Sequence, residues 1–433
     1  MFRTPKTHCA ITCLALTALA SGCSSDSGDE NTDSRTMEIF SWWTAPGEVD
    51  ALSALLAVHQ ERNPDFKYVN LAANVATNAR EVLETRMTQG QPPDTFQANI
   101  GADLFKWVNF NQIDDSDTKL EPLDAYKQAN GWDTGFPPEV IEALSSPASG
   151  KLYGVPVNIH RINAMFFDKK FMDEHDLTVP ESLDDLEAFC ENLPNIDPDR
   201  ACLAIGNKYD WTMALFALEM VLPAVGGVDF YESYWTGNED PGDDRLVEAL
   251  DRVLALWPHF NADANEVDWS DAVDKLVRGE AVFAPMGDWA KGYLQVKGLV
   301  PGVDFGQVAF PGSDGFVFTA DCFPLPKGAP SRAQALKLLA TFGSVEGQVA
   351  FNRIKGSIPA RIDASASDFD EVAQHTMLDF DQARGEGKLV RALSGLTPPD
   401  MPDNGPVVKE MLISGDTQPV LFHLENSYGK LQR

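Results

Sequence analysis

Trp42 and Trp43 are adjacent, and the carboxylate of Glu48 follows them closely in the chain. The flat face of an indole ring stacks on the C–H face of a sugar ring, and a carboxylate accepts hydrogen bonds from paired hydroxyl groups. Packing of both tryptophans in a hydrophobic core is the alternative, and the sequence leaves it open. The three residues predict a site for a small polyhydroxylated ligand.

Three later segments also bring polar and aromatic side chains together. Together they supply an amide, an imidazole, a carboxylate, an indole and an ammonium group. Each has a structural alternative, such as a buried histidine with satisfied nitrogens, a tryptophan packed in a turn, or a lysine that complements a helix dipole. The candidate ligand-binding residues of these segments are Asn158, His160, Asp288, Trp289 and Lys355.

Catalytic signatures are missing from the sequence. It has no GxSxG nucleophile elbow, no P-loop, no GxGxxG turn and no HExxH zinc motif. Cys190, Cys202 and Cys322 have no second cysteine or histidine at the spacing of a zinc site. We therefore predict a protein that is not an enzyme and that needs no metal or cofactor. A glycosidase with two catalytic carboxylates has no local signature, so that alternative stays open.

The elements that position these residues alternate between strand and helix from residue 37 onward. Apolar periodicity and turn residues predict strands at 37–43, 66–74 and 95–99, and helices at 47–62, 77–88 and 102–109. This order predicts a parallel sheet whose ligands bind beyond the carboxyl ends of the strands. Trp42 and Trp43 end the first strand, and Gln97 and Asn99 end the third. We expect all four at the same edge of the sheet.

The rest of the chain continues in the same α/β style, without an internal repeat or a predicted transmembrane segment. The segment from Ser182 to Asp185 has the form of a capping box that opens a helix. Residues 211–222 are apolar and typical of a helix. We also expect helices at 245–257, 331–342 and 345–354, and a crossing strand at 315–325.

Residues 1–22 carry the pattern of an export signal, with a basic start and a short apolar run at 9–20 that is too short to span a bilayer. Ala20 and two small residues precede Cys23, which resembles a bacterial lipobox with Ala20 where Leu is usual. The resemblance implies a diacylated Cys23 at the mature N-terminus, which is enough for stable anchoring. An ordinary signal peptide cut near Cys23 is the alternative. Residues 23–36 are polar and acidic and predict a flexible tether.

Length and charge narrow the class of protein further. A chain of 433 residues predicts two or three domains. It has 65 acidic and 34 basic residues, for a net charge of −31. Such a surface repels nucleic-acid phosphates and anionic lipids, so we expect no nucleic-acid partner. Among the cysteines beyond Cys23, Cys190 and Cys202 flank a turn-like segment and form the favoured disulfide pair, which leaves Cys322 as a buried thiol.

Five segments recur in an order that resembles a known family. They read EIFSWWTAPGE, PPDTFQANIG, LYGVPVNIHRINAMFFDKK, WSDAVDKLVRGEAVFAPMGDWAKG and NRIKGSIPAR. Together they resemble the family 1 extracellular solute-binding proteins of ABC importers, and they are most similar to the glucose/mannose type. The resemblance implies an α/β, two-lobed periplasmic-binding-protein fold of type 2 topology, with discontinuous lobes and a hinge. We expect an N-terminal lobe at 37–146 and 290–345, and a C-terminal lobe at 147–289 and 346–433.

The same resemblance implies which residues contact the ligand. In glucose-type members the paired tryptophans, the following glutamate and the aspartate of the MGDW segment contact the sugar. Two departures indicate a different or longer sugar, because Asn99 stands where a lysine is frequent and residues 389–396 lack a histidine that relatives carry. The complete set of expected ligand-binding residues is Trp42, Trp43, Glu48, Gln97, Asn99, Asn158, His160, Trp211, Asp288, Trp289 and Lys355.

These implications give one function hypothesis and two alternatives. The hypothesis is a monomeric, extracytoplasmic lipoprotein that binds a mono- or oligosaccharide in an interlobe cleft and delivers it to ABC permease subunits. Its contact with the membrane would be through the lipid anchor only. The alternatives are a lipoprotein glycosidase and a binding protein for a non-sugar solute such as a polyamine. Lys355 and Arg161 near the expected cleft argue against a polycation.

Overall fold

The computed structural model of the chain describes residues 36–71, 79–108 and 115–432. The predicted signal peptide at 1–22 and the predicted lipid-attachment residue Cys23 lie outside the described residues. So does nearly all of the predicted tether at 23–36.

The first sheet is parallel, as the alternation of strands and helices predicts. Its strands are β1 (Met37–Phe40), β2 (Tyr68–Asn70) and β3 (Thr95–Phe96), with β1 in the middle. Helix α1 (Glu48–Arg62) connects β1 to β2, and α2 (Ala79–Thr88) lies between β2 and β3 in the chain. The buried stripe of α1 is formed by Ala51, Leu52, Leu55, Leu56 and His59, which is the helical spacing that the sequence shows.

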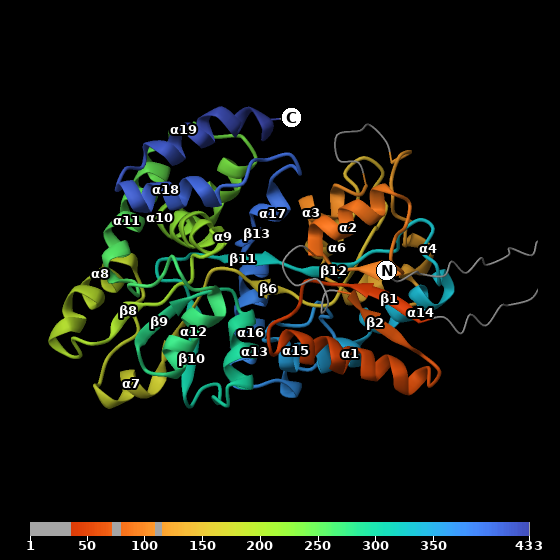
Figure 1. Cartoon of the computed structure of the whole chain (residues 1–433), viewed down its shortest axis with the longest axis horizontal. Coiled ribbons are helices and arrows are strands. Elements are labelled where there is room, and N and C mark those ends of the chain that lie inside the picture. Colours follow the sequence, from red (N-terminus) through yellow and green to blue (C-terminus); the bar gives the residue numbers. More distant parts are fainter. Residues whose placement is uncertain (1–35, 72–78, 109–114, 433) are drawn as a thin grey trace, which may run out of the picture. The chain divides into compact units, whose positions relative to one another are not determined.

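Two large hydrophobic cores organise the described residues. The first core is the buried cluster that runs from Met37 to Ile159 and from Phe316 to Ala383. Its main helices are α1, α14 (Arg332–Phe342) and α15 (Val345–Lys355), with α1 and α15 side by side (Figure 1). It also contains the long helix α16 (Glu371–Glu386) and the short helices α3 (Ala102–Phe105), α4 (Asp124–Lys127), α5 (Trp132–Gly135) and α6 (Pro138–Ala143). A sheet of β4 (Ala98–Asn99), β12 (Asp321–Phe323) and β5 (Val155–Pro156) completes it.

The second core runs from Ile162 to Phe310 and from Val390 to Tyr428. Its sheet has the order β10 (Phe305–Ala309), β7 (Ala164–Asp168), β9 (Ala281–Pro285) and β8 (Ala201–Leu203). Helix α8 opens with the predicted capping box, in which Ser182 and Asp185 satisfy each other's backbone amides. The helices of this half are α7 (Lys169–Glu174), α8 (Leu183–Asn192), α9 (Trp211–Leu215), α10 (Leu222–Trp235), α11 (Asp244–Leu256), α12 (Trp269–Val277), α13 (Trp289–Val296), α17 (Leu393–Leu396), α18 (Gly405–Ser414) and α19 (Gln418–Ser427).

Three strands lie where the chain passes between the two cores. They are β6 (His160–Arg161), β11 (Phe316–Thr319) and β13 (Leu389–Arg391), in the order β13-β11-β6. We call this three-stranded sheet the crossover sheet. The sequence predicts one crossing strand at 315–325, and the structure divides it into β11 and β12, which belong to different sheets. Every passage between the cores therefore runs through one small sheet.

Two contacts show with which core the segments near the predicted lobe boundaries pack. Strand β10 pairs along its length with β7, which keeps residues 290–310 with the second core. Helix α15 packs against α1, which keeps residues 345–355 with the first core. The two lobes with boundaries at 146/147, 289/290 and 345/346 stay a prediction; the buried clusters change over near residues 159–162, 310–316 and 383–390.

One helical run among the described residues, Trp211–Trp235, is long and apolar enough to cross a membrane by length and composition alone. Most of its apolar stretch is buried, and its side chains belong to the second core. Gly227 interrupts the run with a φ of 79°. The run has the character of a central core helix.

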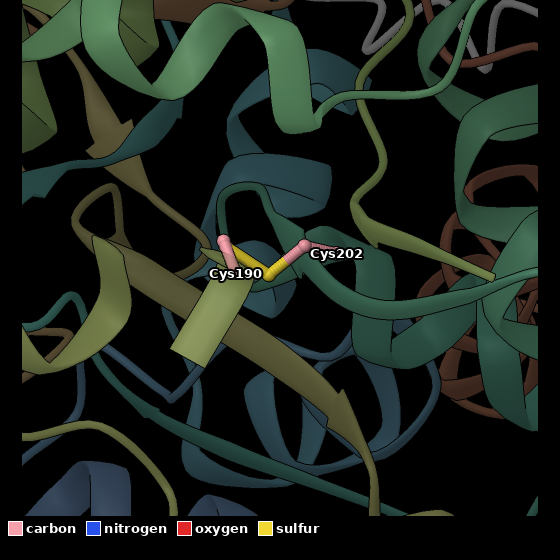
Figure 2. The surroundings of a disulfide bond; sticks show 2 residues. All are labelled: Cys190 and Cys202. Carbon is pink, nitrogen blue, oxygen red and sulfur yellow. A yellow bond between two sulfur atoms is a disulfide. The ribbon is translucent and has the colours of Figure 1, made fainter. Parts of the chain in front are cut away.

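Cys190 and Cys202 form a disulfide with an S–S distance of 2.05 Å (Figure 2). The bond joins the end of α8 to strand β8, and both residues are buried. It is the pair that the sequence favours. Cys322 is a buried free thiol on β12.

Candidate ligand-binding cavity

A cavity of about 850 Å³ is lined by residues of both cores and of the crossover sheet. Trp42 follows β1 of the parallel sheet, and Asn99 ends β4, which belongs to a separate antiparallel sheet of the first core. Trp211 and Trp289 open helices of the second core. Eight of the expected ligand-binding residues line the cavity, namely Trp42, Trp43, Glu48, Asn99, His160, Trp211, Trp289 and Lys355.

The two adjacent tryptophans have different environments. Trp43 is 1% exposed, and its ring centroid lies 5.1 Å from that of Phe351 and 5.8 Å from that of Phe323. It is a core residue that also reaches the cavity wall. Trp42 is half-buried, and the guanidinium of Arg80 lies 4.4 Å from its ring centroid. Only Trp42 presents a broad surface that a ligand can cover, once Arg80 moves aside.

A second aromatic group comes from the other core. The ring centroids of Trp211 and Trp289 lie 6.1 Å apart, and Trp289 meets His160 edge-on at 5.3 Å. Trp211 is 37% exposed, which is unusual for so large an apolar side chain. Gly287 is required here, because a Cβ at that position would lie 2.2 Å from the Trp289 ring. The absence of a side chain at Gly287 therefore leaves room for the neighbouring indole.

Glu48 and Lys355 form an ion pair in the cavity wall, with Oε1 and Nζ 2.9 Å apart. Glu48 is the first residue of α1 and Lys355 the last of α15, so each side chain also complements the dipole of its own helix. Gly356 follows in the left-handed region at φ 97°. The pair offers a ligand one acceptor and one donor whose charges already compensate each other.

Three expected ligand-binding residues lie behind the cavity wall instead of lining it. Gln97, Asn158 and Asp288 are at most 1% exposed. Gln97 donates to Asp321 Oδ1 at 2.7 Å and accepts from the backbone amide of Trp42 at 3.1 Å. Asn158 donates to Asp321 Oδ2 at 2.8 Å. These side chains hold the residues that do reach the cavity.

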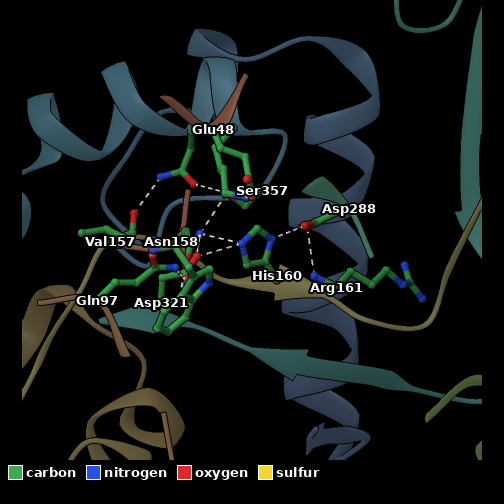
Figure 3. A network of polar contacts seen from close by, with 12 residues as sticks. Glu48, Gln97, Val157, Asn158, His160, Arg161, Asp288, Asp321 and Ser357 are labelled. Carbon is green, nitrogen blue, oxygen red and sulfur yellow. Dashed lines mark hydrogen bonds and ion pairs between the residues drawn. The ribbon is translucent and has the colours of Figure 1, made fainter. Parts of the chain in front are cut away.

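His160 is the centre of this buried network (Figure 3). Its Nδ1 bonds to Asp288, and its Nε2 lies 3.0 Å from Asp321 Oδ2. Asp288 also accepts the backbone amide of Arg161 at 2.9 Å. Burial alone would lower the pKa of His160, but the two carboxylates outweigh it and raise that pKa above its usual value. Burial likewise opposes ionisation of Asp321, yet its bond to His160 lowers the pKa of that carboxyl.

Arg161 points away from the cavity. Its guanidinium pairs with Asp379 and lies 4.7 Å from the ring centroid of Phe316. The prediction that Arg161 would repel a polycation in the cavity is therefore wrong. The charge of Lys355, the other cation of that prediction, is already compensated by Glu48. Among the described residues, no group of three His, Cys, Asp or Glu side chains is arranged to hold a metal ion.

Several cavity residues were not predicted from the sequence. Asp321 and Thr319 lie on the crossing segment, where the sequence gives only an apolar run ending in an acid. Glu219 is the one acid in the apolar stretch 211–228, and such an isolated acid is a signal that could have identified it. The other unpredicted residues with polar or aromatic side chains are Thr44, Arg80, Glu81, Asp103, Asp268, Trp269, Ser270, Tyr293 and Ser394.

Comparison with known proteins bears on the identity of the chain. An uncharacterized ABC transporter extracellular-binding protein of Pyrococcus horikoshii is 30% identical over 432 residues, covering 96% of this chain and 94% of the relative. A probable sugar-binding periplasmic protein of Rhizobium meliloti is 30% identical over 365 residues, covering 83% of this chain and 84% of the relative.

A solved structure shares the fold. It is a bacterial solute receptor with an exclusive substrate preference for β-D-galactopyranose, and it matches with a TM-score of 0.77 at 17% identity over 92% of this chain and 99% of that chain. This similarity shows the two-lobed fold. A family model described as bacterial extracellular solute-binding protein matches residues 59–376. The chain therefore belongs to the family of bacterial extracellular solute-binding proteins.

Proposed function

We propose that the chain is the sugar-binding component of an ABC importer and that it holds a mono- or oligosaccharide in the cavity between its two cores. The observation that carries the proposal is the composition of the cavity wall, in which several indoles lie together with carboxylates, hydroxyl groups and the Glu48–Lys355 ion pair. Sugars present C–H faces above and below the ring and hydroxyl groups around its rim, which suits this wall. Family membership and the sugar-binding name of the Rhizobium relative support the same conclusion.

The cavity has room for more than one ring. Its volume of about 850 Å³ falls in the upper part of the range for small-molecule sites, which is about 300–1,000 Å³. Trp42 packs against the first core, Trp289 packs against the second, and Trp211 opens α9, whose buried apolar residues belong to the second core. A ligand held between them bridges the two cores.

The crossover sheet suits a hinge between the lobes. Closure around a ligand would require only small backbone changes in β6, β11 and β13, because every passage between the cores runs through them. A ligand that contacts both lobes favours the closed state by its differential affinity for that state. We propose that the closed, loaded monomer is the form that docks on the permease subunits.

We propose further that the mature protein is anchored outside the cytoplasm by lipid on Cys23. The support is the lipobox-like sequence before Cys23 and the acidic, polar stretch that follows it. Cells given a labelled fatty acid should incorporate the label into the wild-type protein but not into a Cys23→Ser variant. Equal labelling of both, or of neither, would contradict the anchor.

The sugar-binding function is tested by titration calorimetry of the soluble protein, residues 24–433, with D-glucose, D-galactose, D-xylose, maltose and raffinose. We expect at least one to bind more tightly than about 1 mM, which corresponds to about −4 kcal/mol. Binding of none would refute the proposal. A larger thermal shift with spermidine than with every sugar would favour a polyamine, and turnover of chromogenic glycosides would favour a glycosidase.

The two kinds of tryptophan should separate on mutation. Trp211→Ala removes an exposed cavity indole, so we expect about tenfold weaker sugar binding or more, with a free energy of unfolding within about 1 kcal/mol of wild type. Trp43→Ala leaves a core cavity, so it should lower the free energy of unfolding by about 3–5 kcal/mol. Tyr209→Ala is the control, since Tyr209 is 58% exposed and outside the cavity wall. Calorimetry and urea denaturation give both readouts, and unchanged affinity in Trp211→Ala would contradict the assignment.

The His160 network should make stability depend on pH. Because its folded-state pKa is raised, charged His160 contributes fully below the unfolded value of about 6.5 and loses that contribution as pH rises through the folded value. His160→Gln should therefore be destabilised by about 3–5 kcal/mol at about pH 6 and by less at about pH 9. Thermal unfolding of both proteins at each pH gives the comparison. His375→Gln, at an exposed position, serves as control, and an equal loss at both pH values would refute a charged His160.

A further inference from the structure

Glu219 lies on a wide π-helical turn, Phe216–Val221, which joins α9 to α10. Trp211, Leu215 and Glu219 follow one another at four-residue intervals, and all three line the cavity. In an α-helix of 3.6 residues per turn, each step of four residues rotates the side chain by about 40° around the axis. The wider turn rotates less per residue and offsets this drift. Such turns are rare and occur frequently at functional sites.

The carboxylate of Glu219 has little to bond with inside the protein. Its Oε2 accepts the backbone amide of Leu393 at 2.9 Å. The buried hydroxyl of Tyr231 lies nearby but makes no hydrogen bond of normal geometry. No ion pair to Glu219 occurs in the part of the chain that the structure describes. Each of the other carboxylates that line the cavity has a partner or is exposed. Glu48 forms an ion pair with Lys355, Asp103 with Arg80 and Asp321 with His160. Asp268 caps α12, and Glu81 is exposed.

Thr319 adds a second unpartnered group to the same wall. Its hydroxyl is buried, lines the cavity and has no hydrogen-bond partner among the described residues. Thr319 ends β11, next to Ala392, whose amide donates to the carbonyl of Phe318 at 2.7 Å. Ala392 precedes Leu393, whose backbone amide donates to the Glu219 carboxylate. A buried hydroxyl without a partner is costly unless a ligand satisfies it.

We propose that Glu219 and Thr319 form a ligand-binding subsite that determines which sugar the cavity accepts. Glu219 accepts hydrogen bonds from two sugar hydroxyl groups, and the Thr319 hydroxyl bonds to a neighbouring oxygen of the sugar. The subsite rests on the proposed function, since it needs a sugar in the cavity. A sugar whose hydroxyl at this place is missing or replaced leaves both groups unpaired and is rejected.

The charge of Glu219 gives this subsite a dependence on pH. Burial, only partly opposed by the Leu393 amide and Tyr231, raises the pKa of Glu219 to about 7. Helices α9, α10 and α11 pack against the π-helical turn. Among the described residues, one titratable side chain interacts with the Glu219 carboxyl. That group is Tyr231 of α10, whose own pKa lies well above its usual value, so it stays neutral. Hydroxyl donors favour the ionised form of Glu219, so sugar affinity should rise as pH increases through about 7.

The test uses Glu219→Gln, which keeps the shape of the side chain but cannot ionise. The probe is whichever of the five sugars binds the wild type most tightly, titrated at about pH 5.5 and about pH 8.5. At the higher pH we expect Glu219→Gln to bind about 10- to 100-fold more weakly than wild type. At the lower pH the two should agree within about threefold, because protonated glutamate resembles glutamine. Thr319→Val should bind about 3- to 10-fold more weakly at both pH values.

A matched control and the thermal midpoints separate binding from folding. Glu232→Gln changes an exposed carboxylate on the same helical run and should bind like wild type at both pH values. Affinity of Glu219→Gln equal to wild type at both pH values would overturn the subsite and leave the sugar-binding function intact. An equal loss at both pH values, with a lowered melting temperature, would assign Glu219 a structural role and overturn the subsite too. Failure of all five sugars to bind wild type would overturn both proposals.

Discussion

One buried imidazole between two carboxylates is the interaction on which the rest of the cavity depends. His160 belongs to the crossover sheet, Asp288 lies between β9 and α13, and Asp321 belongs to strand β12 of the first core. Removing three ionisable groups from water is costly, and the cost is offset only if every donor and acceptor finds a partner. Gln97, Asn158 and the amide of Arg161 complete that set. The network therefore ties both cores to one position of the crossover sheet, and Trp42 and Trp289 are placed by contact with its members.

Different groups of the cavity wall supply its apolar and its polar contacts. Apolar stacking surface comes from indoles at the ends of elements, where the chain bends and a large ring can be left half-covered. Polar contacts come from groups whose charge is already compensated, such as the Glu48–Lys355 pair. A neutral, hydroxyl-rich solute gains from such a wall without having to displace a free charge. The cavity wall carries six carboxylates, against which stand Arg80, Lys355 and His160, so the wall shares the acidic character of the chain.

The sequence predicts the class of fold and most of the cavity residues, and its errors have physical causes. The parallel sheet and α1 follow from periodicity and from breakers such as Asn63 and Pro64, which are local signals. Gln97, Asn158 and Asp288 are predicted to contact the ligand, because polar residues at strand ends commonly face a site. In the structure each is buried and hydrogen-bonded to another side chain of the protein. The points where the chain passes from one core to the other depend on long-range pairing, such as that of β10 with β7, more than a hundred residues earlier in the chain. No local pattern reveals such a pairing. Glu219 was missed because helical periodicity assumes an α-helix, and the local wide turn changes which residues face the cavity.

The crossover sheet also has a consequence for how the chain is made. Neither core is continuous, because the second core interrupts the first and itself ends with residues beyond Val390. Strands far apart in sequence pair only after the intervening chain has been ordered, which slows folding. A chain that emerges N-terminus first cannot complete either core until almost the whole polypeptide is present. The strands and helices of residues 37–159 must therefore wait, partly exposed, while the second half arrives.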